Sequence, residues 1–224
     1  MELYFNEKGK VEVKDIDKNS QVTDFIKAID NLLDENPLYC IDCNDNCCSR
    51  DWNIELDIVF FNRLYQGAIK GIKGKSGRRI DDLKKNQSNK QKKWIDTLID
   101  INALNRPVFN SSPCIFLKEN GLCKIYAKRP LICRGYICYE ESDNYKLVRD
   151  IILDSLNLIL LIKLISFKEN QSMEEIASNK FRVENIDLLP FHKSDYNISI
   201  YNLVKGLKSV LGHYRFKKIQ SLFS

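Results

Sequence analysis

The sequence predicts a mainly α protein in which an irregular cysteine-rich core and two small β-hairpins pack on a helical bundle. Three observations support this fold class. Several long stretches repeat apolar residues at three- and four-residue spacing, two short segments carry hairpin patterns, and the cysteines form two groups that interrupt the helices. The chain has 224 residues, of which 44% are hydrophobic and 29% charged, and this composition excludes a disordered or low-complexity protein.

We expect one domain over residues 1–224, because a chain of this length can bury an adequate core in a single unit. Within it, a cysteine-cluster part covers about residues 37–140 and a helical part covers 145–224. The first residues lack the basic and apolar regions of a secretory signal, and charges at Asp154 and Lys163 interrupt the longest apolar stretch. These features predict a cytoplasmic protein that has no membrane partner.

The elements of the first half follow from local patterns. Residues 2–13 alternate around a polar turn and predict a hairpin. Ser20 is the expected N-cap of an amphipathic helix that ends at Pro37. Helical spacing of apolar residues returns over 53–69 and again over 82–104, so we expect two further helices there.

The second half begins with a predicted tight hairpin over 114–126, which has Asn-Gly in its turn. A short helix or turn is expected at 133–138. Residues 145–167 are apolar almost all round a helix, which predicts a central core helix. A capping box at 172–175 starts a short helix, and 195–222 predicts at least one more amphipathic helix.

The eight cysteines carry the strongest functional signal. Their spacing is C-x2-C-x3-C-C in the first group, followed by intervals of eight, nine and four residues in the second: Cys40, Cys43, Cys47, Cys48, then Cys114, Cys123, Cys133, Cys138. Without an export signal the thiols meet a reducing compartment, where disulfides are rare. We therefore favour metal ligation by these cysteines over disulfides and over buried inert thiols.

The spacing permits two kinds of metal site. Two residues separate Cys40 from Cys43, so both thiolates can approach one ion, as in zinc knuckles and many iron–sulfur sites. Adjacent Cys47 and Cys48 point in different directions, so one of them should serve a second metal, a cluster iron or redox chemistry. This pair and the excess over four ligands favour an iron–sulfur cluster, and zinc stays open. Either metal requires the two groups to fold against a common centre.

The second cysteine group is cationic. Residues 124–134 contain Lys124, Lys128, Arg129 and Arg134 and no acidic residue. Cations beside thiolates lower the pKa of cysteine and donate hydrogen bonds to sulfur. Arg129 and Arg134 are therefore candidate cofactor-binding residues around the eight metal ligands. Two alternatives are the binding of an anionic substrate and the bracing of the loop through backbone carbonyls.

A separate basic segment covers residues 67–93. It holds ten Lys and Arg residues and only two Asp residues, which gives it a charge of +8 in a chain whose net charge is +5. We expect a flexible connection here, with docking of an acidic protein partner as the alternative. No aromatic residues alternate with the charges, so nucleic-acid binding has little support, although the sequence leaves it open.

The combined cysteine motifs resemble a known family. The first group is followed by C-x-F-L at 114–117 and by C-x-I-Y-x-x-R-P-x-x-C-R at 123–134. This pattern is similar to that of the cysteine-cluster family described as zinc- or iron-chelating domains, which also includes flagellin lysine N-methylases. The resemblance covers residues 40–138 and implies a metal or iron–sulfur centre held by these cysteines. It does not imply a particular reaction.

Three functions therefore stay open. The first is a metal-binding protein that holds an iron–sulfur cluster or zinc and has no assigned reaction. The second is an enzyme that uses this centre, such as a lysine N-methylase-like protein modifier or a redox enzyme. The third is an interaction module shaped by structural zinc. The sequence has neither a G-x-G-x-x-G fingerprint nor the C-x3-C-x2-C order of radical S-adenosylmethionine enzymes, and no catalytic residue is assigned.

Overall fold

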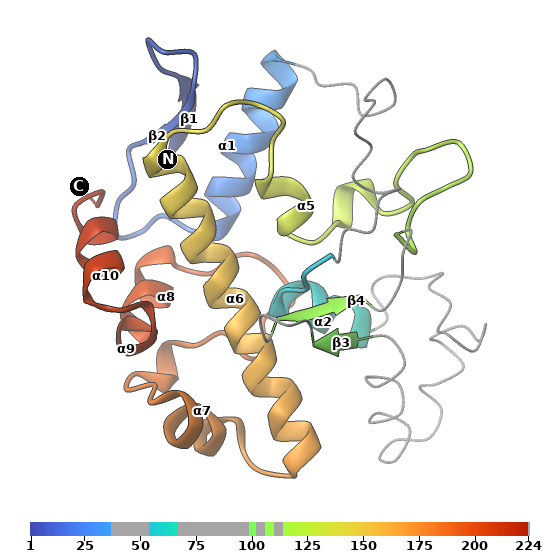
Figure 1. Ribbon diagram of the computed structural model, residues 1–224, viewed down its shortest axis with the longest axis vertical. Coiled ribbons are helices and arrows are strands. Elements are labelled where there is room, and N and C mark those ends of the chain that lie inside the picture. Colours follow the sequence, from blue (N-terminus) through green and yellow to red (C-terminus); the bar gives the residue numbers. More distant parts are fainter. Residues whose placement is uncertain (37–53, 67–98, 102–105, 110–113, 224) are drawn as a thin grey trace.

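The computed structural model describes residues 1–36, 54–66, 99–101, 106–109 and 114–223 (Figure 1). Within these residues the fold is mainly α, with eight α-helices and two small antiparallel strand pairs. This confirms the predicted fold class. The first cysteine group and the basic segment 67–93 lie outside the described residues.

The N-terminal hairpin and first helix form as predicted. Strands β1 (Glu2–Phe5) and β2 (Val11–Lys14) pair antiparallel, and α1 covers Val22–Glu35. Its capping box is formed by Gln21 and Asp24, one residue beyond the expected cap. The hydroxyl of Ser20 instead accepts a hydrogen bond from the amide of Asp17 at 3.0 Å, closing the turn before the helix.

Helix α2 (Ile58–Tyr65) is shorter than the predicted 53–69, because residues 54–57 are extended and Asp57 caps the helix. The prediction of a helix over 82–104 is wrong at its end. Ile99–Ile101 is strand β3, which pairs with β4 (Pro107–Phe109). The triplet Ile-Asp-Ile fits the alternating pattern of a strand as well as the spacing of a helix. Pairing with β4 selects the strand.

The predicted hairpin over 114–126 forms a tight turn with one isolated antiparallel bridge, between Leu117 and Cys123. Gly121 has a φ of 79°, which glycine adopts without strain, and the amide of Lys118 donates to the carbonyl of Leu122 at 2.8 Å. A 3₁₀ turn, η2 (Tyr126–Lys128), and the short helix α5 (Ile132–Gly135) follow.

Helix α6 (Asp143–Glu169) is the central element, as the all-round apolar pattern predicts. It begins at the N-cap Ser142, whose hydroxyl accepts from the amide of Tyr145. In Figure 1 it runs through the middle of the molecule, and it contacts α2, α7 and α8 as well as strands β2 and β4. Most of its buried apolar residues belong to one cluster that extends from Leu3 to Ile219.

The C-terminal part is helical as expected. The capping box of Ser172 and Glu175 starts α7 (Met173–Phe181), and a 3₁₀ turn, η3 (Ile186–Leu188), follows. The predicted amphipathic segment forms three short helices, which are α8 (Ile200–Gly206), α9 (Lys208–Leu211) and α10 (His213–Gln220). Within the described ranges no helix combines the length and the apolar character needed to cross a bilayer.

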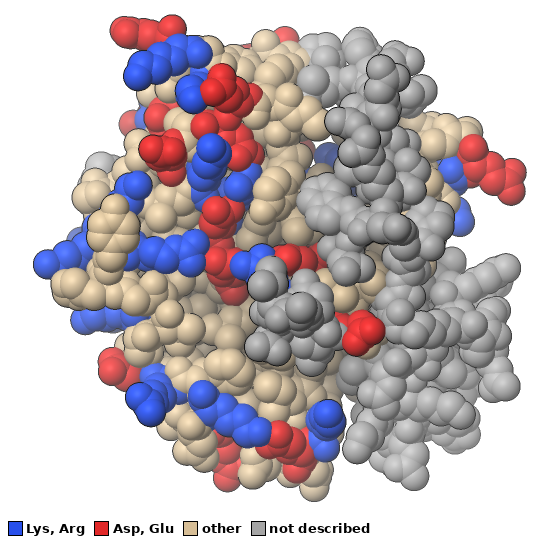
Figure 2. Space-filling model, in the orientation of Figure 1, with Lys and Arg blue, Asp and Glu red and all other residues tan. Residues whose placement is uncertain are grey.

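Ion pairs connect these layers at the surface. Arg106, just before β4, pairs with Glu55 at 2.9 Å and with Asp154 of α6 at 2.7 Å, and Arg215 of α10 also contacts Asp154. Acidic and basic side chains are intermixed over the described residues on the face seen in Figure 2. Exposed pairs of this kind each contribute little to stability.

Candidate metal centre

Four of the eight predicted ligands lie in the described part of the chain. Cys114 and Cys123 belong to the 114–126 hairpin, Cys133 lies in α5 and Cys138 follows it. The first three are half-buried and pack against the apolar core, whereas Cys138 is exposed. The other four predicted ligands, Cys40 to Cys48, lie outside the described residues.

An aromatic anchor positions the hairpin that carries Cys114 and Cys123. Phe116 is 3% exposed and makes edge-to-face contacts with Phe60 of α2 and Phe109 of β4, with ring centroids 5.9 and 5.3 Å apart. Its carbonyl accepts from the amide of Lys124 at 2.8 Å. The hairpin is thus fixed to the core at one apolar side chain, and its turn reaches outward.

A buried carboxylate positions α5 and Cys133. Asp57 is 3% exposed, caps α2 through the amide of Phe60, and accepts from the amide of Leu131 at 3.0 Å and from the hydroxyl of Tyr196 at 2.9 Å. Burial raises the pKa of Asp57, while these three hydrogen bonds act in the opposite direction. No local pattern in the sequence indicates the two distant donors, Leu131 and Tyr196.

The end of α5 is fixed by residues that the sequence reasoning missed. The buried hydroxyl of Tyr145 donates to the carbonyl of Gly135 at 2.7 Å. Arg149 lies over the ring of Tyr136, 4.0 Å from its centroid, and pairs with Glu141 and Asp150. Both contacts originate on α6, so the central helix orients the segment between Cys133 and Cys138. Only the spacing of Tyr145 and Arg149, four residues or about one helical turn, could have suggested that they share a face of α6.

The described ends of the chain on either side of 37–53 both contact the second cysteine group. At the first end, the hydroxyl of Tyr139 donates to the carbonyl of Asn36 at 2.9 Å, and Asp30 pairs with Arg134 at 3.2 Å. At the other end, Asp57 holds Leu131 as described above, two residues before Cys133. The described segments that flank residues 37–53 therefore both contact the part of the chain that carries the second cysteine group.

Within the described residues, no three His, Cys, Asp or Glu side chains form a group that could hold a metal ion. The second cysteine group therefore does not make a complete site from its described residues alone.

Arg129 and Arg134, the two predicted cofactor-binding residues, lie just after η2 and within α5. Arg134 donates through Nη1 to Asp30 at 3.2 Å and through Nη2 to the carbonyl of Ala127 at 2.6 Å. The guanidinium of Arg129 lies over Tyr126, 4.0 Å from the ring centroid. The contact with Ala127 is the expected bracing interaction. The Nε atoms of both arginines are buried and have no hydrogen-bond partner in the structure.

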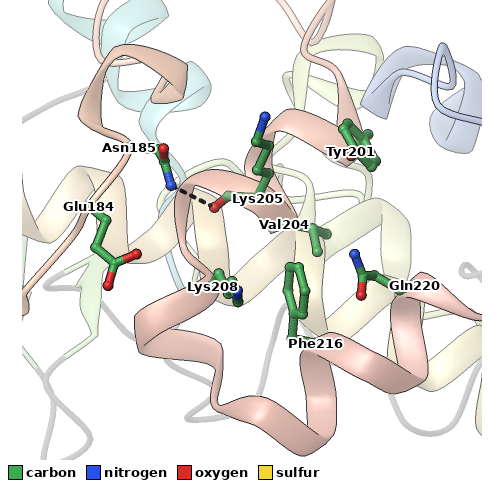
Figure 3. Close-up of a pocket in the computed structure, with 8 residues that line it drawn as sticks. All are labelled: Glu184, Asn185, Tyr201, Val204, Lys205, Lys208, Phe216 and Gln220. Carbon is green, nitrogen blue, oxygen red and sulfur yellow. Dashed lines mark hydrogen bonds between the residues drawn. The ribbon is translucent and has the colours of Figure 1, made fainter.

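A hollow of about 350 Å³ lies elsewhere, between η3, α8 and α10 (Figure 3). Lys208 lies beside it with its ammonium 5.3 Å from the ring centroid of Phe216. Eight residues line it: Glu184, Asn185, Tyr201, Val204, Lys205, Lys208, Phe216 and Gln220. None of them is a predicted site residue, so this hollow is separate from the cysteine-bearing segment.

Comparison with protein families gave one match to the chain. A family named CxxCxxCC, described as "Putative zinc- or iron-chelating domain", matches residues 39–149. Searches of curated proteins and of solved structures gave no match. The matched range contains all eight cysteines and both arginines, together with α2, α5 and the start of α6.

Proposed function

Since this chain belongs to the CxxCxxCC family of zinc- or iron-chelating domains, we propose that its two cysteine groups bind one metal centre. The ligands are drawn from the eight cysteines named above. One observation carries this proposal: described residues close to each side of the range of the first group, Asn36 before it and Asp57 after it, are hydrogen-bonded to the segment of the second.

The donor set fits the metals that the family description gives. Thiolates are the preferred soft ligands of zinc and of iron–sulfur clusters, and four of them complete either kind of site. The described cysteines do not form such a group alone. Ligands from Cys40–Cys48 would complete the site, and a range of 17 residues whose flanking segments both contact the second group could supply them.

We assign an iron–sulfur cluster as the first choice and zinc as the second. The adjacent cysteines at positions 47 and 48 and the total of eight thiols exceed the needs of one zinc ion. When bound, a cluster would supply one-electron chemistry, whereas a closed zinc site would supply stability alone. In both cases the protein's own task is to hold the hairpin, α5 and the first cysteine group together.

The test is anaerobic purification of the full chain, followed by metal analysis and a visible spectrum. Stoichiometric iron with sulfide and broad visible absorption is expected for the cluster, and a colourless protein with stoichiometric zinc for the second choice. Cys133→Ser and Cys43→Ser should each lose metal, because each removes a thiolate from a different group. Lys118→Ser, an exposed change in the same hairpin as Cys123, is the matched control and should retain metal.

Two outcomes would contradict the proposal. One is wild-type protein without stoichiometric metal. The other is full metal content in Cys43→Ser together with loss in Cys133→Ser, because the centre would then belong to the second group alone.

A further inference from the structure

Two buried guanidinium N–H groups near Cys133 have no acceptor. Among the residues that the structure describes, three buried side-chain nitrogen or oxygen atoms lack a hydrogen-bond partner, namely Arg129 Nε, Arg134 Nε and Ser155 Oγ. Two of the three lie within one six-residue stretch that contains Cys133. Buried polar atoms are almost always paired, and an unpaired donor on a charged group is especially unfavourable. This pair of donors therefore needs an explanation.

The other contacts of both arginines leave these donors unused. The two terminal nitrogens of Arg134 donate hydrogen bonds to Asp30 and to the carbonyl of Ala127, so its guanidinium is fixed at two points. Arg129 is held by its face against Tyr126. Bracing and stacking thus explain where each guanidinium lies, and they leave the buried Nε–H of each without a role.

The local charge indicates what kind of acceptor would suit them. Residues 114–138 contain five Lys and Arg residues and a single acidic residue, Glu119. A centre of four thiolates around zinc, or around an oxidised four-iron cluster, carries a formal charge of about −2. Sulfur in such a centre accepts hydrogen bonds readily, and outer donors of this kind tune metal sites.

We propose that the Nε–H groups of Arg129 and Arg134 donate hydrogen bonds to thiolate sulfurs of the metal centre. This inference rests on the proposed function and assigns the two arginines as positioning residues for it. Their charge is opposite to that of the thiolates, and contacts with Asp30, Ala127 and Tyr126 already hold both guanidinium groups in place. Lysine at either position would keep the charge and lose the planar donor geometry.

Cobalt(II) titration of the reduced, metal-free full chain tests this role, because cobalt–thiolate coordination gives a charge-transfer band. Arg129→Met and Arg134→Met should each bind Co²⁺ about 10- to 100-fold more weakly, the range seen when outer-shell partners of a metal site are removed. The band should also move to lower energy, because a hydrogen bond to sulfur stabilises the electrons that are transferred. A purely structural role would not move the band.

Matched controls separate the donors from the other contacts of the arginines. Asp30→Asn removes the ion pair of Arg134, and Tyr126→Leu removes the ring beneath Arg129, while both changes retain the Nε–H groups. Each control should retain the wild-type band and bind Co²⁺ within about threefold of wild type. Arg134→Lys should resemble Arg134→Met in the position of the band.

The failures of the two proposals are distinguishable. A wild-type protein that gives no cobalt–thiolate band contradicts the proposed function. A normal wild-type band that stays unmoved in both arginine variants overturns the present inference alone. Metal-independent binding of inorganic phosphate, lost in Arg129→Met and Arg134→Met, would overturn it in favour of an anion site.

Discussion

The long helix α6 and the cysteine-bearing segment 114–138 are stabilised in different ways. Sixteen residues of α6 are buried, and the helix contacts three other helices and two strands. The cysteine-bearing segment has one isolated bridge, one 3₁₀ turn and a four-residue helix, and three of its four cysteines are only half-buried. Apolar burial along a whole helix therefore accounts for the first region, whereas a few buried side chains such as Phe116 and individual polar contacts hold the second.

The largest effect is expected from a cavity in α6. Leu160 is fully buried, so Leu160→Ala should lower the free energy of unfolding by about 3–4 kcal/mol, through lost burial and an unfilled cavity. Leu158, half-buried on the same helix, provides the control, and Leu158→Ala should have a smaller effect. Chemical denaturation of metal-free and metal-loaded protein measures both. If metal binding restored the free energy of unfolding of Leu160→Ala to that of wild type, the two regions would not be stabilised in different ways.

The next effect concerns the junction between the regions. Asp57→Ala removes the acceptor of the Phe60 and Leu131 amides and of the Tyr196 hydroxyl, so it should destabilise the chain by about 2–3 kcal/mol. The loss of stability should be less than the sum of three hydrogen bonds, because the variant no longer bears the free-energy cost of desolvating a buried carboxylate. Unlike Leu160→Ala, it should also lower metal affinity, since it releases the turn before Cys133. Unchanged affinity would show that this carboxylate supports the helical part only.

A buried amine in the helical part should make stability depend on pH. Lys163 donates to Asn62 at 2.7 Å, and burial lowers its pKa to about 8. The unfolded chain, with an ordinary lysine pKa near 10.5, binds more protons above pH 8, so the penalty for burial falls as pH rises. From pH 8 to pH 10 the free energy of unfolding should gain about 2 kcal/mol from this residue.

Thermal or urea unfolding across this pH range, compared between wild type and Lys163→Met, measures that gain. The variant should lack it, whereas Lys168→Met, an exposed change on the same helix, should retain it. Equal pH profiles for wild type and Lys163→Met would exclude Lys163 as the source.

The smallest effect tests the contact between Tyr139 and the end of α1. Tyr139→Phe removes one half-buried hydrogen bond to the carbonyl of Asn36 and should reduce stability by about 1 kcal/mol. Because that contact joins the two cysteine-bearing ranges, metal should also dissociate faster in the presence of a chelator. Tyr214→Phe, at a side chain that is 77% exposed, should change neither quantity. A dissociation rate equal to wild type would mean that the contact does not support the centre.

The sequence predicted the elements that depend on neighbours along the chain. The apolar pattern located α6, and Ser172 with Glu175 located the start of α7, because both signals lie within a few residues. The helix predicted at Ile99–Ile101 is wrong, since pairing with Pro107–Phe109 determines that conformation. A strand partner cannot be read from a short apolar run.

The candidate site shows the same limit. Spacing and charge identified the cysteines and the two arginines, and the family match supports a metal-chelating role for this range. The contacts of Asp57 with Leu131 and Tyr196 span 74 and 139 residues, so no local pattern could predict them. The unused donors on Arg129 and Arg134 likewise depend on the three-dimensional contacts of each guanidinium, which the sequence does not specify.

The carboxylate at position 57 limits how this chain can diverge in evolution. A replacement there must present oxygen acceptors in two directions at once, toward α2 and toward a backbone amide and a phenol from distant parts of the chain. Two of these donors are backbone amides, which any residue except proline supplies, so the requirement falls mainly on the acid at 57 and the tyrosine at 196. A change at either of these two positions, 139 residues apart, leaves the other without a buried hydrogen-bond partner.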